Sequence, residues 1–75
     1  MKRSLNDLAP GKSGRVVSVE GGYGVRQRLR TLGLVEGATV RKLSALALGG
    51  PVVVEVNRVQ VAVGRGMARR VWVEG

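Results

Sequence analysis

Residues 51–63 read Pro-Val-Val-Val-Glu-Val-Asn-Arg-Val-Gln-Val-Ala-Val, and this stretch decides the fold class. β-branched valine is enriched in strands, and its alternation with other residues over 59–63 is typical of a half-buried strand. Pro51 stands at a strand start, where its missing N–H does no harm. Asn57 tolerates a positive φ, so Asn57 and Arg58 fit a two-residue hairpin turn. The stretch therefore predicts two antiparallel strands, 51–56 and 59–63.

Similar patterns on both sides of this hairpin predict three more strands and one helix. The further strands are valine-containing segments between glycine turns, at residues 15–20, 38–43 and 69–74. Val25, Leu29 and Leu32 have the i, i+4, i+7 spacing of one helix face. Gly33 follows them, where a helix favours a left-handed C-terminal cap. We expect this helix to cover one open end of a barrel, and residues 64–68 to form a turn or one loop of 3₁₀ helix.

Together these elements predict an all-β fold, a small five-stranded SH3-like barrel with one short helix between strands 1 and 2. The chain has 75 residues, enough for one domain, so we expect residues 1–75 to form a single barrel domain. Strand alternation and helical spacing together predict which side chains are buried. The expected core residues are Val17, Val19, Leu29, Leu32, Val40, Val54, Val61 and Val71.

Histidine and cysteine are both absent from the sequence. Their absence excludes disulfides, thiol nucleophiles and a histidine general base, and it removes the ligands that transition metals prefer. The carboxylates are isolated from one another along the chain; they are Asp7, Glu20, Glu36, Glu55 and Glu74. We therefore expect no enzyme, no catalytic residue, no cofactor and no tight iron or zinc site. Cysteine-free composition and the lack of an apolar leader favour the cytoplasm.

The net charge of +8 attracts anions of several kinds. Arg26, Arg28 and Arg30 concentrate this charge on the predicted helix, which suits an acidic protein surface, a nucleic-acid backbone or simply a solvated face. Small barrels that bind nucleic acid usually offer several aromatic side chains for base stacking. Only Tyr23 and Trp72 are available here, and Trp72 alternates with valines in a predicted core strand. Nucleic acid is therefore the less favoured partner.

Two further segments have a binding and a structural interpretation. Residues 20–24, Glu-Gly-Gly-Tyr-Gly, resemble a glycine-rich loop that could hold an anion at a helix N-terminus, but a strand-to-helix turn explains them better. Leu46 and Leu48 lie in an apolar loop that either contacts a partner or packs against the barrel end. The candidate partner-binding residues are Arg26, Arg30, Leu46 and Leu48.

Several motifs in the chain follow one family pattern from end to end. They are Leu5-Xaa-Xaa-Leu8, Gly11 and Gly14, Arg28-Leu29-Arg30-Thr31-Leu32-Gly33-Leu34 with Gly37, Leu48-Gly49-Gly50-Pro51, Val61-Ala62-Val63 and Val71-Xaa-Val73. In these motifs the chain resembles the FeoA family, the small cytoplasmic component of bacterial ferrous iron uptake. The same five-stranded SH3-like module forms the C-terminal domain of iron- and manganese-dependent repressors.

The resemblance implies an accessory protein without catalytic residues. Its partner would be the large membrane ferrous iron permease, which carries a cytoplasmic GTP-binding domain, and its action would be docking that modulates the permease. No small-molecule substrate is implied. A basic nucleic-acid-binding barrel is the main alternative, and a barrel that reads a peptide segment is a third; a salt titration of binding separates the first two.

Overall fold

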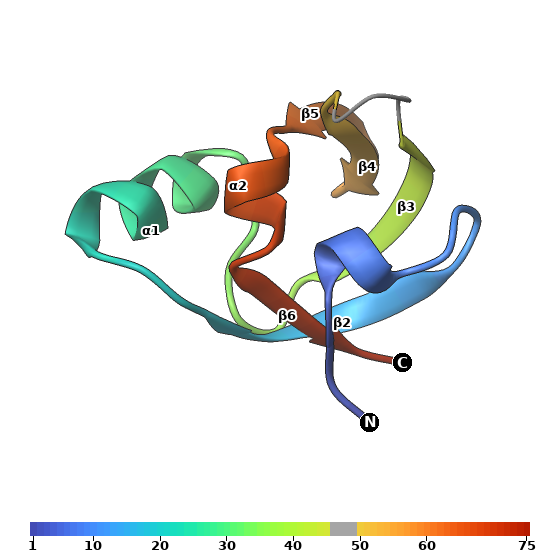
Figure 1. The fold of residues 1–75 in the computed structure, drawn as a ribbon, viewed down its shortest axis with the longest axis horizontal. Coiled ribbons are helices and arrows are strands. Elements are labelled where there is room, and N and C mark those ends of the chain that lie inside the picture. The colour runs from blue at the N-terminus through green and yellow to red at the C-terminus, as the bar shows by residue number, and fades with distance from the viewer. Residues whose placement is uncertain (46–49) are drawn as a thin grey trace.

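The computed structural model describes residues 1–45 and 50–75, apart from the side chain of Ala45. The chain forms short strands with three helical segments placed between them (Figure 1). In chain order the elements are β1 (Arg3–Ser4), η1 (Leu5–Asp7, a 3₁₀ helix), β2 (Ser13–Val19), α1 (Tyr23–Thr31), β3 (Thr39–Ala45), β4 (Val52–Val56), β5 (Val59–Val63), α2 (Arg65–Ala68) and β6 (Val71–Glu74). None of the helices in these described ranges is long and apolar enough to cross a membrane.

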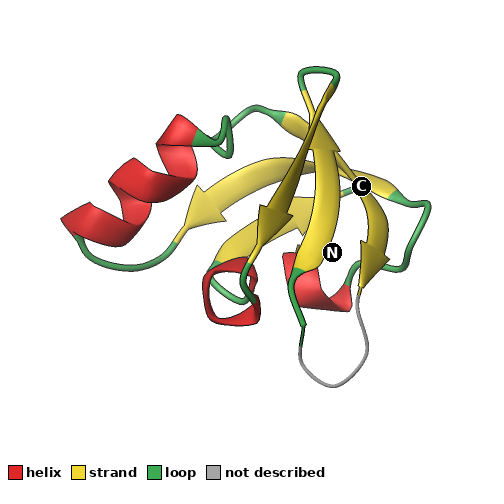
Figure 2. Cartoon of the chain, turned by 90° about the horizontal axis from the view of Figure 1, so that it is seen from above, coloured by secondary structure: helices red, strands yellow, loops and turns green. Residues whose placement is uncertain are grey.

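The strands of the described residues form one antiparallel sheet of six, in the order β1-β6-β2-β3-β4-β5. The sheet curls around the core, as expected for the SH3-like fold (Figures 1 and 2). The five predicted strands and the helix between the first two are confirmed. Two elements differ from expectation: the two-residue strand β1 adds to the sheet beside β6, and residues 65–68 form the α-helix α2, where a turn or one loop of 3₁₀ helix is expected from the sequence.

The β4–β5 hairpin forms as its sequence predicts. Asn57 and Arg58 have φ of 53° and 65°, which is the left-handed conformation that a type I′ turn requires at both central positions. Val56 therefore faces Val59 across the turn, and the pairing continues to Val52 and Val63. Alternate side chains of β4 are fully buried, as the valine pattern indicates.

The core matches the predicted list at five positions and departs from it at three. Val19, Leu29, Val40, Val54 and Val71 are buried. In β2 the pairing with β6 shifts between Val16 and Ser18, so an irregularity in the strand turns Val16 inward. The other three residues of the list are only half-buried: Val17, at this irregularity, Leu32, at the end of α1, and Val61, on an edge strand.

The 3₁₀ helix η1 is anchored to the core by apolar and polar contacts. Leu5 and Leu8 are buried, and η1 contacts α2 and β6. Lys42 in β3 is only 3% exposed, and its Nζ donates hydrogen bonds to the carbonyl oxygens of Asn6 and Leu5 at 2.8 and 3.3 Å. Burial lowers the pKa of Lys42, and the nearby charge of Arg65 lowers it further, while Asp7 opposes the shift. This lysine ties the N-terminal segment to the middle of the sheet.

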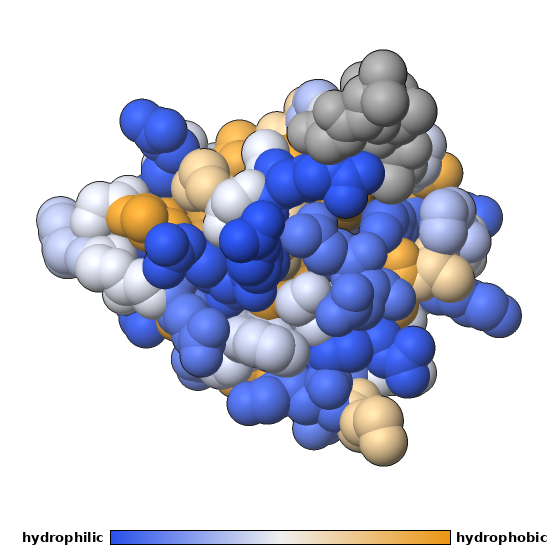
Figure 3. Space-filling view, in the orientation of Figure 1, coloured by the Kyte–Doolittle hydropathy of each residue, from blue (hydrophilic) through white to orange (hydrophobic). Residues whose placement is uncertain are grey.

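The helix α1 is attached much more loosely and projects from one side of the barrel (Figure 1). Leu29 is its one fully buried side chain, while Val25 and, just past its end, Leu32 pack half-buried against the core. Apolar atoms therefore remain at the surface among the side chains of α1 (Figure 3). The expected cover over the barrel end is thus partial, and one side of the helix is left to form a groove.

Candidate functional site

The chain enters α1 through a turn that only glycine accommodates easily. Gly21 has φ of +124°, in the region that disfavours side chains, and a Cβ there would lie 3.2 Å from the Cβ of Val25. Gly22 caps the helix in an extended conformation without a side-chain hydrogen bond. The glycine-rich segment 20–24 thus has the backbone conformation of the strand-to-helix turn, which supports the structural interpretation of this motif.

The end of α1 reverses the chain and creates the opposite wall of the groove. The N–H of Gly33 donates to the Arg30 carbonyl, and the N–H of Leu34 donates to the Leu29 carbonyl, both at 2.9 Å. With φ of +89° at Gly33, this is a Schellman motif, and it confirms the predicted glycine cap. Leu34 turns back into the core beside Leu29, so Val35 is placed across from the helix.

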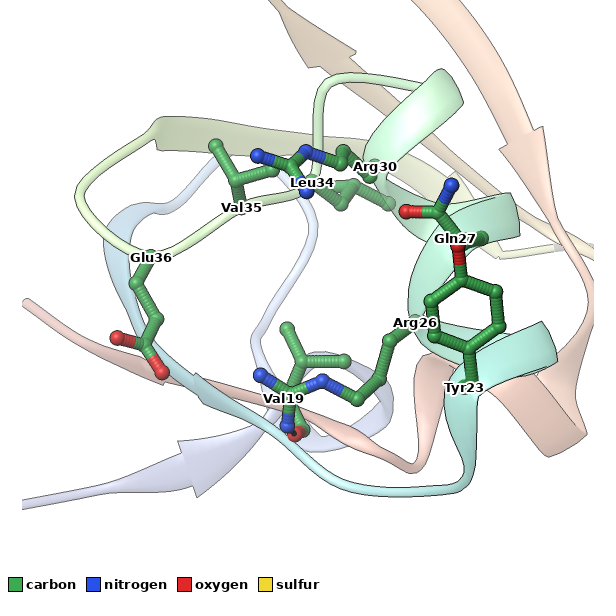
Figure 4. Close-up of a pocket in the computed structure, with 8 residues that line it drawn as sticks. All are labelled: Val19, Tyr23, Arg26, Gln27, Arg30, Leu34, Val35 and Glu36. Carbon is green, nitrogen blue, oxygen red and sulfur yellow. Dashed lines mark hydrogen bonds between the residues drawn. The ribbon is translucent and has the colours of Figure 1, made fainter.

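A groove of about 540 Å³ lies between α1 and the segment that follows it (Figure 4). Its lining comes from three elements of the chain: Val19, Tyr23, Arg26, Gln27, Arg30, Leu34, Val35 and Glu36. Val19 and Leu34 are buried and supply an apolar floor. Tyr23 is 79% exposed and Val35 39% exposed, so both offer apolar surface at the rim. The groove therefore combines a closed floor with free apolar side chains above it.

Two arginines bring positive charge to this groove. The Nη1 of Arg26 donates a 2.9 Å hydrogen bond to the Val19 carbonyl, which holds the guanidinium across the floor. Arg30, one helical turn further, lines the same wall and is exposed. Glu36 lies on the opposite side (Figure 4). Since two cations face one carboxylate, the groove favours a ligand that carries negative charge next to an apolar group.

The structure thus places two of the four predicted partner-binding residues together. Arg26 and Arg30 line one groove, while Leu46 and Leu48 lie outside the described residues, so the predicted role of the apolar loop stays a prediction. Tyr23 and Val35 also line the rim, and the sequence did not predict them there. A signal existed for Val35, because an apolar β-branched side chain in a glycine turn has no strand to pack in.

Trp72 does not offer an open stacking surface. Its side chain is half-buried, and its indole Nε1 is buried without a hydrogen-bond partner among the described residues. The Nζ of Lys2 lies over the ring, 5.4 Å from its centroid, which is a cation–π contact. Tyr23 is therefore left as the one exposed aromatic side chain of this sequence. A surface with a single free aromatic ring fits poorly with base stacking along a nucleic-acid strand.

The charged residues do not gather into a site with evident metal chemistry. Within residues 1–45 and 50–75, no three side chains among histidine, cysteine, aspartate and glutamate come close enough to hold an ion. The composition predicts only weak affinity for metal ions, and calorimetric titration with ferrous iron under anaerobic conditions would measure it. The arrangement of the groove suits non-covalent binding.

Solved structures with the same fold define the class of this protein. A crystal structure of the "Iron Uptake Regulatory Protein (FeoA)" is 39% identical, with a TM-score of 0.90 over 99% of this chain and 96% of that one. The solution structure of the FeoA protein from Chlorobium tepidum is 35% identical, with a TM-score of 0.85 over 95% and 68% of the two chains. A manganese-dependent transcriptional repressor shares the fold at 20% identity, with a TM-score of 0.88 over 96% of this chain and 40% of its own. The class is the SH3-like barrel of FeoA proteins and metal-dependent repressors.

The sequence itself matches the model of the FeoA domain over residues 3–75. The chain belongs to the FeoA family, which confirms the resemblance stated above. A search of curated proteins found no match. Membership of this family supports a role in ferrous iron transport.

Proposed function

We propose that this chain is an accessory protein of ferrous iron transport that docks on the cytoplasmic part of the membrane iron permease through the groove beside α1. The observation that supports this surface is the combination of exposed Tyr23 with Arg26 and Arg30 around an apolar floor. Tyrosine and arginine are the residue types that most often dominate binding energy at protein interfaces. The expected ligand is an acidic segment of the permease that carries an apolar side chain.

The groove is prepared for such a ligand before it binds. Arg26 is already held by its hydrogen bond to the Val19 carbonyl, so less side-chain freedom is lost when an acidic group pairs with it. Tyr23 has few rotatable bonds and a large apolar ring, so it can anchor a partner at low entropic cost. Docking would modulate the permease by stabilising whichever of its conformations binds this chain more tightly. The chain would act from the cytoplasm, where the GTP-binding domain of the permease lies.

A pair of charge reversals on one helix tests the groove directly. Arg30→Glu places a carboxylate in the groove, whereas Arg28→Glu makes the same change in net charge at an exposed position of α1 that does not line it. Binding to the purified cytoplasmic part of the permease, measured by calorimetry, should weaken by about tenfold or more for Arg30→Glu and for Tyr23→Ala. Arg28→Glu should change it only by long-range steering, an effect that disappears as salt is raised. Equal losses for the two reversals would contradict the groove.

Two further arms of the experiment cover the remaining predictions of the sequence. Leu46→Asp, with circular dichroism to check the fold, should weaken the same binding if the apolar loop contributes a contact. Duplex and single-stranded nucleic acids should show no binding at physiological salt. Tight binding to them, steeply reduced by salt and unchanged by Tyr23→Ala, would favour the nucleic-acid alternative over the permease.

A further inference from the structure

The strand β5 forms one of the two edges of the sheet, and its sequence lacks the residue types that commonly protect a strand edge. The sheet order ends at β5, and its hairpin with β4 extends past the neighbouring strands (Figure 2). Residues 59–63, Val-Gln-Val-Ala-Val, contain no charge and no proline. Soluble proteins commonly block such edges with lysine, proline or an inward-pointing charge. Val59 is 56% exposed, and Gln60 and Ala62 are exposed as well.

The hairpin geometry determines which backbone groups point away from the sheet. The residues that flank a two-residue turn form a hydrogen-bonded pair, and bonded pairs then alternate along the hairpin. Val56 and Val59 flank the turn, so the bonded residues of β5 are Val59, Val61 and Val63. The N–H and C=O groups of Gln60 and Ala62 therefore face outward. Among the turn and loop hydrogen bonds of the described residues, none uses these groups.

We propose that β5 is a strand-addition site for a second copy of this chain, with the two β5 strands antiparallel about a twofold axis at Val61. In this register Gln60 of each copy exchanges both backbone hydrogen bonds with Ala62 of the other, so the four outward groups of each strand are all satisfied. If the register shifts to the next hydrogen-bonded pair in either direction, Arg58 lies opposite Ala62 of the other copy, or Gly64 lies opposite its Gln60. Arg58 is in the left-handed turn and the Gly64 carbonyl already accepts from α2, so those registers satisfy fewer groups.

Charge favours a copy of this strand over an acidic partner at this edge. An acidic segment finds no cation within residues 59–63, whereas an identical uncharged strand meets no like charge there. The remainder of each molecule, at +8, repels the other copy. The dimer should consequently be weak and should strengthen as salt screens the repulsion. Groove docking to an acidic partner should respond to salt in the opposite direction, so the two surfaces are distinguished by the sign of the effect.

The oligomeric state of the whole chain tests the edge. Sedimentation equilibrium should show the mass rising from 7.9 kDa toward twice that value with concentration, more at about 500 mM than at about 50 mM salt. Gln60→Pro removes an outward N–H and no bond to β4, and should weaken association by about tenfold or more, because both copies lose a hydrogen bond. Gln60→Ala keeps the N–H and should associate like the original chain. A chain that stays monomeric throughout, or a Gln60→Pro variant that dimerises equally well, would overturn the proposal.

A cross-linking pair tests the register even if the proline variant fails to fold. The chain has no cysteine, so single substitutions are unambiguous. In Val61→Cys the two cysteines are directly opposite each other, with their Cα atoms about 4.5 Å apart, which is within the range of a disulfide. Val59→Cys is more exposed, yet its two copies lie about 13 Å apart in this register. Oxidation should link Val61→Cys chains much faster than Val59→Cys chains. The reverse order, which exposure alone would produce, contradicts the proposed pairing.

Discussion

The helices on either side of β2 are held to the barrel in opposite ways. Before β2, the single turn of η1 and the residue that follows it bring Leu5 and Leu8 into the core, and Lys42 donates hydrogen bonds to η1 carbonyl groups from the sheet. After β2, the longer helix α1 contributes one fully buried side chain, Leu29, and leaves Tyr23 almost free. The shorter element is thus the better anchored. The contrast indicates that η1 serves stability, whereas α1 keeps side chains available for a partner.

The largest expected effect is the loss of the anchor on η1. Leu5 is fully buried, so Leu5→Ala leaves a cavity and should lower the free energy of unfolding by about 2–5 kcal/mol. Leu32→Ala removes the same atoms from a half-buried position at the end of α1 and should cost markedly less. Urea unfolding followed by circular dichroism measures both. Equal losses would show that the two helices contribute alike.

A second comparison uses two glycines of the α1 region. Gly33 has φ of +89° and lies close to Asn57, so Gly33→Ala should cost about 1–2 kcal/mol and loosen the wall of the groove. Gly24, inside the helix, has open space around a Cβ, so Gly24→Ala should raise stability by about 0.5–1 kcal/mol. Thermal unfolding should move in opposite directions for the two variants. A loss of stability in Gly24→Ala would mean that the space around this position of α1 is not open.

Lys42 makes the stability of the η1 end depend on pH. Its pKa in the fold is below the ordinary value of 10.5, so between the two values the unfolded chain holds the proton that the folded chain has released. The free energy of unfolding should therefore rise with pH in that window, and the cost of keeping Lys42 charged should persist at lower pH. In Lys42→Met this rise should be absent. Parallel pH profiles for the two chains would refute the buried-charge interpretation.

The smallest expected effect on stability belongs to a residue that is expected to contribute strongly to docking. Tyr23 is exposed, so Tyr23→Ala should change the free energy of unfolding by no more than about 0.5 kcal/mol. The weaker permease binding expected of Tyr23→Ala would then reflect a lost contact in a folded protein and not unfolding. If Tyr23→Ala unfolds the chain instead, α1 is part of the structural core and the contrast with η1 disappears.

The amino-acid sequence by itself determined the features that depend on near neighbours. Valine alternation and the Asn57-Arg58 turn predicted the hairpin, and the apolar stripe followed by Gly33 predicted a capped helix that carries three arginines. These signals are local because backbone preference, turn conformation and side-chain direction repeat within a few residues. The family motifs, spread along the whole chain, likewise required no structure.

The tertiary structure alone decided the features that depend on distant pairing. Pairing with β6 produced the irregularity in β2 that left Val17 half-buried, and the fold brought Leu5 under the sheet. The groove exists because the Schellman turn brings Val35 opposite Tyr23. The local sequence around either residue does not indicate this arrangement. The sequence of β5, which has neither charge nor proline, also does not show that this strand lies at an edge. Which segments become neighbours is set by the free energy of the whole packed chain, so no local pattern encodes it.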